Sequence, residues 1–98
     1  MEQTRITVNY RIKELSPERR TTDWILTSVP PDEESNYYGT GYYMTAVPIK
    51  DDGEPDRNAA LYWDMRYAGT TDINELADIW VKDYYKGTIK KTVKYYVA

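Results

Sequence analysis

The chain contains no cysteine, no histidine and no phenylalanine. Without cysteine or histidine it has no disulfide, no thiol nucleophile, no imidazole base and none of the usual zinc ligands. These absences exclude most common enzyme chemistries, so we expect a protein that is not an enzyme and that binds no metal or cofactor. An activity that relies on carboxylates, tyrosine or lysine stays open.

Long apolar runs are also missing. The most apolar stretches, such as residues 59–63, fall far short of the roughly 20 residues that cross a bilayer. The first five residues lack the basic and apolar regions of a signal peptide. We therefore expect a cytoplasmic protein with no membrane contact.

The chain has 98 residues, and a core of that size supports one domain. We expect a single domain over residues 1–98, since no linker or internal repeat divides it. Hydrophobic residues make up 41% and charged residues 30%, which is typical of folded globular proteins and not of disordered chains.

Alternating apolar and polar residues predict five strands. The clearest is residues 5–13, with Ile6, Val8, Tyr10 and Ile12 on one face. Residues 23–29 and 37–50 follow, the second with a bend at Gly39 and Gly41. Residues 58–67 pair with it as a hairpin, placing Ala59, Leu61, Trp63, Met65 and Tyr67 on one face. Residues 88–97 form the last strand, with Ile89, Val93, Tyr95 and Val97 on its apolar side.

One amphipathic helix is predicted from residue 71 or 72 to residue 86. Asp72 and Glu75 have the spacing of a capping box, and Gly87 provides the C-terminal stop. A shorter signal at residues 16–18 predicts a single helical turn. The resulting fold class is α+β, with two layers: a mostly antiparallel sheet of about five strands and one helix near the C-terminus, in the order β-β-β-β-α-β.

One helix cannot cover both faces of such a sheet, so the other face meets water or a partner. Eleven tyrosines, eight of them in adjacent pairs, place aromatic rings on both faces, because neighbouring strand residues point opposite ways. On the uncovered face we predict a partner-binding surface built from Tyr42, Met44, Tyr62, Arg66, Lys90, Lys94 and Tyr96. A one-residue shift of the last strand would exchange its two faces and remove its lysines from this surface.

The acidic loops are the alternative site. Residues 23–56 carry eight acidic groups and one basic group, concentrated in Asp32, Glu33, Glu34, Asp51, Asp52, Glu54 and Asp56. Such loops attract basic partners, although loop acidity more often serves solubility alone. The alternation of acidic residues over 52–58 does not match an EF-hand, because Arg57 stands where that loop needs glycine.

These patterns predict a small non-catalytic protein that binds a protein partner. Its size and composition are typical of accessory or inhibitory proteins of phages and mobile elements. Two alternatives remain open: a single-stranded nucleic-acid binder that uses Tyr62, Arg66, Lys90, Lys94 and Tyr96, and a homodimer formed through the sheet.

Overall fold

A computed structural model describes residues 2–11, 19–32, 34, 41–85 and 88–96 of the chain. Its strands are β1 (Glu2–Arg11), β2 (Arg19–Val29), β3 (Tyr43–Pro48), β4 (Leu61–Asp64) and β5 (Thr88–Tyr96), and its helix is α1 (Ile73–Tyr84). Short 3-10 turns flank β4, namely η1 (Arg57–Ala59) and η2 (Arg66–Ala68). The predicted α+β class and the order β-β-β-β-α-β are confirmed.

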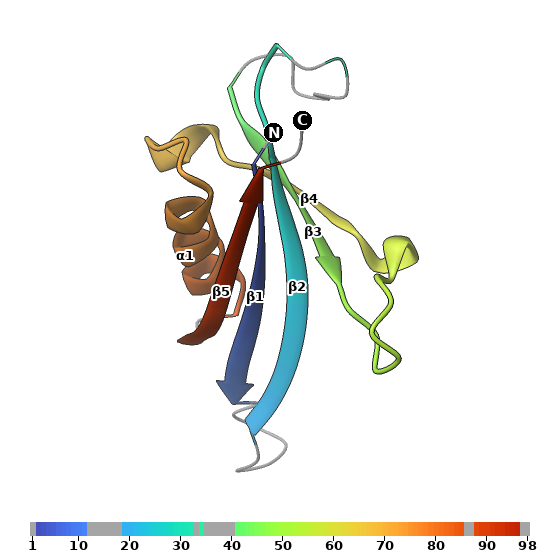
Figure 1. The fold of residues 1–98 in the computed structure, drawn as a ribbon. Coiled ribbons are helices and arrows are strands. Elements are labelled where there is room, and N and C mark those ends of the chain that lie inside the picture. Colours follow the sequence, from blue (N-terminus) through green and yellow to red (C-terminus); the bar gives the residue numbers. More distant parts are fainter. Residues whose placement is uncertain (1, 12–18, 33, 35–40, 86–87, 97–98) are drawn as a thin grey trace.

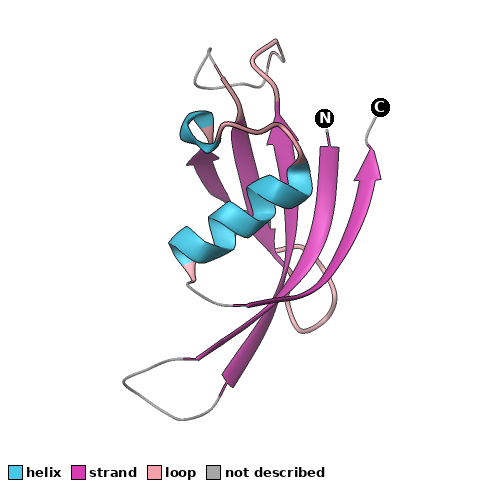
Figure 2. Ribbon diagram, turned by 90° about the vertical axis from the view of Figure 1, so that its left-hand side faces the viewer, coloured by secondary structure: helices cyan, strands magenta, loops and turns pink. Residues whose placement is uncertain are grey.

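The five strands form one sheet in the order β4-β3-β2-β1-β5, and every neighbouring pair is antiparallel. The predicted hairpin is therefore present, since β3 pairs with β4, and the first strand pairs with the last. Figure 1 shows α1 on one side of the sheet, and Figure 2 shows it crossing that face obliquely.

The helix begins where the sequence predicts. The Asp72 side chain accepts hydrogen bonds from the backbone N–H groups of Asn74 and Glu75, at 2.9 and 3.1 Å, which satisfies two otherwise unpaired donors of the first turn. The Thr4 hydroxyl of β1 donates to the Asn74 side chain at 3.2 Å, and this bond ties the start of α1 to the sheet. The predicted stop at Gly87 lies outside the described residues, as do the turn at residues 16–18 and the bend at Gly39.

The core lies between α1 and the sheet. From the sheet it receives Ile6, Val8, Trp24, Leu26, Met44, Ala46 and Met65, and from the helix Ile73, Leu76, Ala77, Trp80 and Val81. The helical residues recur every three or four positions, so they form one apolar stripe. The Trp80 ring meets Trp24 edge to face at 5.1 Å between centroids. The predicted amphipathic character of the helix is confirmed, with Tyr84 on the margin of the apolar stripe.

The faces of two strands, β3 and β5, differ from the prediction. Met44 is fully buried against α1 instead of lying on the uncovered face. The error arises because both sets of alternate residues in β3 contain apolar side chains, so the alternation does not identify the core face. Strand β4 is shorter than predicted, and Tyr67 lies in η2 with 59% of its surface exposed instead of on the apolar side of a strand.

The second difference is a bulge in the β1–β5 ladder. Ile89 pairs with Val8, a core position, but Lys91 already pairs with Thr7, so Lys90 is an extra residue at the register shift. Beyond the bulge, Val93 pairs with Arg5 and Lys94 with Thr4. Because directly paired residues belong to the same side of a sheet, position 94 belongs to the helix side. The predicted placement of Lys94 on the uncovered face is wrong for this reason, and the same pairing, Tyr96 with Glu2, moves Tyr96 with it.

Candidate binding site on the uncovered face

We call the side of the sheet opposite α1 the open face. Its described side chains include Gln3, Arg5, Thr7, Asn9, Thr21, Asp23, Ile25, Thr27, Thr45 and Tyr62, and no helix of the described chain covers them. An Asp23 carboxylate lies near its centre. One oxygen of that carboxylate accepts from the Arg5 guanidinium at 3.0 Å, and the other accepts from the Thr7 hydroxyl at 2.7 Å. The middle of the open face is therefore a polar network of paired groups.

The β3 end of the same side is less open than the sequence predicts. Val29, Tyr43 and Val47 point away from α1, but at most 9% of each remains exposed. The Tyr43 ring packs against Tyr62 at 6.2 Å between centroids. Tyr62 itself stays 53% exposed, so among the described side chains it is the large aromatic surface on this side of the sheet.

The acidic turn, residues 50–56, follows β3 on the side of the sheet away from α1 (Figure 1). The turn closes through a hydrogen bond from Gly53 N–H to the Lys50 carbonyl at 2.9 Å, and Ile49 pairs with Pro55. The N–H of Ile49 donates to the Asp23 carbonyl at 2.8 Å, which fastens the base of the turn to β2. These bonds fix the base of the acidic turn beside β2, while its acidic residues 51, 52 and 54 stay exposed.

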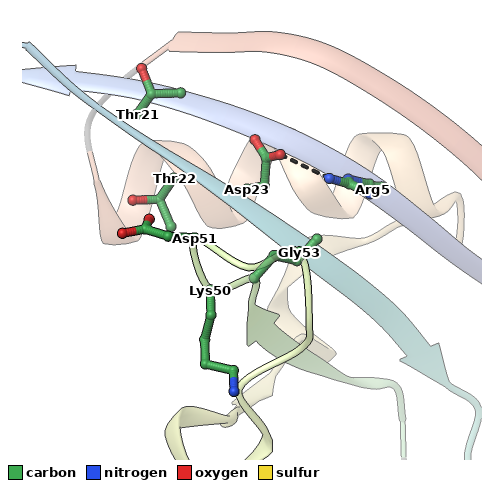
Figure 3. Close-up of a pocket in the computed structure, with 8 residues that line it drawn as sticks. Arg5, Thr21, Thr22, Asp23, Lys50, Asp51 and Gly53 are labelled. Carbon is green, nitrogen blue, oxygen red and sulfur yellow. Dashed lines mark hydrogen bonds and ion pairs between the residues drawn. The ribbon is translucent and has the colours of Figure 1, made fainter.

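A cleft of about 430 Å³ lies between the acidic turn and the open face. Its walls come from β1, β2 and the turn, and its lining residues are Arg5, Thr21, Thr22, Asp23, Ile49, Lys50, Asp51 and Gly53 (Figure 3). The sequence patterns predict the uncovered face and the acidic loops as two alternative binding sites. In the structure, part of the open face and one acidic loop border the same cleft.

Of the predicted residues, Tyr62 and Arg66 belong to the β4 edge, Tyr62 within β4 and Arg66 in η2. The predicted placement of Tyr42 on the uncovered face is wrong, because Tyr42 has the same parity as the buried Met44 and lines a small cavity with Ser28 and Thr71 on the helix side. Arg66 is held by Asp64, with contacts of 2.5 and 2.8 Å from its guanidinium to one carboxylate oxygen. These hydrogen bonds hold the pKa of Asp64 below its ordinary value of 3.8. The Arg66 side chain also packs over Gly41, whose φ of +71° and lack of a Cβ atom make that contact sterically available. Arg66 is therefore already paired.

The other predicted contacts are not assembled with them. Met44 belongs to the core, and the backbone register separates Lys94 and Tyr96 from Tyr62. Lys90 lies at the bulge. The side chains of β5 lie outside the described part of the structure, so the evidence there is the strand pairing alone.

The acidic residues divide between two loops. Asp51, Asp52 and Glu54 are exposed on the acidic turn and Asp56 is half-buried at its end. Asp32 and Glu34 are exposed beyond β2, and Glu33 lies outside the described residues. Of the two acidic loops, the acidic turn is therefore the one that borders the cleft.

Sequence reasoning missed Arg5, Thr21, Thr22 and Asp23 as site residues. Arg5, Thr21 and Asp23 lie in the polar half of their strands, where the pattern indicates only exposure to water, and Thr22 is a polar residue on the opposite side, paired with Val8. Their common cleft arises from the pairing of β1 with β2 and from the return of the chain at the acidic turn. The spacing of residues along one strand does not indicate that the chain returns to β2 at the acidic turn.

A second aromatic group lies on the helix side. The Tyr84 ring stacks on Trp80 at 5.1 Å and meets Trp63 edge to face at 5.7 Å, and Tyr84 remains 42% exposed. Nearby, the Tyr67 hydroxyl donates to Asp83 at 2.6 Å. Partial burial, followed by this hydrogen bond to a carboxylate, raises the pKa of Tyr67 above its ordinary value.

Within the described residues no three carboxylates gather in a way that could hold a metal ion. In the same part of the chain no helix has the length and apolar character needed to cross a membrane. Comparisons with protein-family models, with curated proteins and with solved structures found no match to this chain.

Proposed function

We propose that this chain is a non-catalytic binding protein that docks on a protein partner through its open face. The observation that carries the proposal is the ring of Tyr62, 53% exposed on the side of the sheet opposite α1, where no described helix covers it. Tyrosine combines a large apolar ring, a polar tip and a low rotamer entropy, and it is enriched among the residues that dominate binding energies. The acidic turn adds negative charge to the same side of the molecule.

A protein partner is favoured over single-stranded nucleic acid by the charges of this face. The two arginines nearest to it, Arg5 and Arg66, are each paired with a carboxylate. The register of β5 puts position 94 on the helix side and position 91, paired with Thr7, on the open face, while the acidic turn on that same side repels phosphate groups. A basic protein surface matches this distribution better than a polyanion does.

The setting we propose is an accessory or inhibitory role in the cytoplasm, of the kind that phages and mobile elements encode. This part of the proposal rests on the size and composition of the chain alone.

Photo-crosslinking from two exposed tyrosines tests the docking face. We would introduce p-benzoylphenylalanine at position 62 or at position 67 in the organism that encodes the chain, irradiate the cells, and identify the adducts by mass spectrometry. Tyr67 is the matched control because it is 59% exposed but lies outside the open face, in η2. We expect a specific protein adduct from position 62 and none from position 67.

The captured partner, once purified, then serves for affinity measurements. We expect Tyr62→Ala to weaken binding about 30-fold, the loss that corresponds to a dominant interface residue, and Tyr67→Ala to change it by less than about twofold. An adduct only from position 67 would move the interface to the helix side. An adduct with a second copy of the chain, or with nucleic acid, would replace the proposed protein partner by one of the two alternatives.

A further inference from the structure

The cleft between the acidic turn and the open face is separate from the hydrophobic core, because none of its lining residues belongs to the core. At about 430 Å³ it is large enough to receive a side chain of another molecule. The charges that line it decide which kind of side chain fits, and each can be followed to its partner.

The basic group at the floor of the cleft is already neutralised. The Arg5 guanidinium lies 3.0 Å from Asp23 (Figure 3). The second oxygen of that carboxylate accepts from Thr7. Since Asp23 and Arg5 satisfy each other, the floor presents a paired dipole and not a free positive charge. An anionic ligand would have to break this pair before it could use the guanidinium.

The second basic group is directed elsewhere. In Figure 3 the Lys50 side chain extends away from Thr21, Thr22 and Asp23. Its ammonium lies 3.7 Å from the carboxylate of Asp52 on the same turn. Lys50 therefore contributes backbone to the wall of the cleft, and its charge is placed outside.

The remaining polar groups are oxygen atoms. The Asp51 carboxylate is exposed and forms no ion pair within the described chain, and the hydroxyl-bearing residues Thr21 and Thr22 line the cleft with it. After the two ion pairs are subtracted, the cleft keeps one negative charge and several hydrogen-bond acceptors.

We propose that this cleft receives a guanidinium group, the side chain of an arginine on the protein partner; the inference rests on the proposed function for the identity of that partner. A guanidinium carries a positive charge and five N–H donors in a planar fork, which suits a carboxylate with further oxygens beside it. An ammonium has three donors around a point, so it matches the charge but uses fewer of these acceptors. The site takes its ligand by charge-assisted hydrogen bonds to Asp51, with the threonine hydroxyls as additional acceptors.

A nuclear magnetic resonance titration tests the cleft without the partner. The probe is the peptide acetyl-Gly-Arg-Gly-amide, and the matched probe replaces arginine by citrulline, which has nearly the same shape without the charge. We expect the arginine peptide to shift the backbone amide resonances of Thr21, Thr22 and Gly53, and the citrulline peptide to leave them in place. Asp51→Asn is expected to weaken binding of the arginine peptide about tenfold.

Asp78→Asn is the control variant, because Asp78 is equally exposed, lies on α1 away from the cleft, and its substitution changes the net charge by the same amount. Three results would overturn the proposal: equal shifts with citrulline, equal weakening by Asp78→Asn, or larger shifts of these amides with inorganic phosphate than with the arginine peptide. Circular dichroism of both variants verifies that they fold.

The two proposals fail separately. A crosslinked partner at position 62, with no arginine binding in the titration, would support the proposed docking face and contradict the proposed role of the cleft. Arginine binding without a crosslinked partner would leave the cleft and remove the docking face.

Discussion

The two sides of the sheet are built from the same strands but use their residues differently. On the helix side, the described residues Ile6, Val8 and Leu26 are completely buried and make a dry apolar layer under α1. On the open face, the residues between them, such as Arg5 and Thr7, are joined in a polar network that stays in contact with water. The apolar side therefore contributes most of the buried packing, and the polar side, which we propose as the docking surface, contributes little of it.

Neighbouring substitutions in β2 test this division with the largest expected effect. Leu26 and Thr27 are adjacent but point to opposite sides, and Leu26 is fully buried. We expect Leu26→Ala to lower the free energy of unfolding by about 3 kcal/mol, because it leaves a cavity under α1. Thr27→Ala removes only the acceptor of a hydrogen bond from Gln3, so it should cost less than about 1 kcal/mol.

Urea unfolding of both variants, followed by tryptophan fluorescence, measures the difference. Equal losses would contradict the division of the sheet into a structural side and a recognition side.

The helix side was largely predictable from sequence. The first strand alternates sharply between apolar and charged residues, so Ile6 and Val8 identify the core face without ambiguity. The helix carries a cap residue, Asp72, and a stripe at helical spacing, and both depend on contacts within a few residues of sequence. Local patterns suffice here because the interactions they report are themselves local.

The open face was predictable only in part. Tyr62 was placed correctly, but Met44 was not, because β3 has apolar residues on both sides. The bulge at Lys90 shifts β5 by one residue, and nothing in its local sequence marks the insertion, since a bulge reflects how two strands fit together. The cleft is lined by residues from positions 5, 21–23 and 49–53, so it can be predicted only when the pairing of all these segments is known.

A substitution at the start of the helix should have the next largest effect on the free energy of unfolding. Replacing Asp72 by alanine removes the acceptor for two backbone N–H groups and should lower the free energy of unfolding by about 1 kcal/mol. Asp78→Ala is the control, because Asp78 is exposed within α1, is not the N-cap residue, and alanine favours a helix. Thermal unfolding by circular dichroism compares the two. A larger loss for Asp78→Ala would mean that the exposed surface of α1 contributes more than its cap.

The ion pair on the open face should contribute less. Arg5 and Asp23 keep 43% and 33% of their side-chain surface exposed. A double-mutant cycle with Arg5→Gln and Asp23→Asn should therefore give a coupling of about 0.5 kcal/mol, as for other exposed pairs. The coupling should fall further in 1 M salt, where charges are screened over about 3 Å. A salt-independent coupling above about 2 kcal/mol would indicate that another element covers this face, and it would break the comparison of the two sides.

The smallest effect concerns Asp64 at the β4 edge of the open face, where hydrogen bonds from the side chain and then from the backbone N–H of Arg66 hold the pKa of the carboxyl below 3.8. A pKa lowered by folding means that the pair stabilises the protein above the unfolded pKa of about 3.9 and that this contribution is lost as the pH falls through the folded value. A carboxyl-detected titration by nuclear magnetic resonance should show Arg66→Gln raising the pKa of Asp64 toward its ordinary value. Arg57→Gln, which removes an exposed arginine of η1 and so changes the charge equally, should leave that titration curve in place.

An unchanged curve in Arg66→Gln would mean that Arg66 is not held by Asp64 in solution. Its guanidinium would then stand free beside Tyr62, and the open face would carry a positive group at one end and the acidic turn at the other. A partner for such a face would need charges of both signs, and the preference for a basic partner surface would no longer follow from the pairing of the arginines. The titration of Asp64 therefore decides whether Arg66 is a paired residue of the fold or a charged group that a partner could contact beside Tyr62.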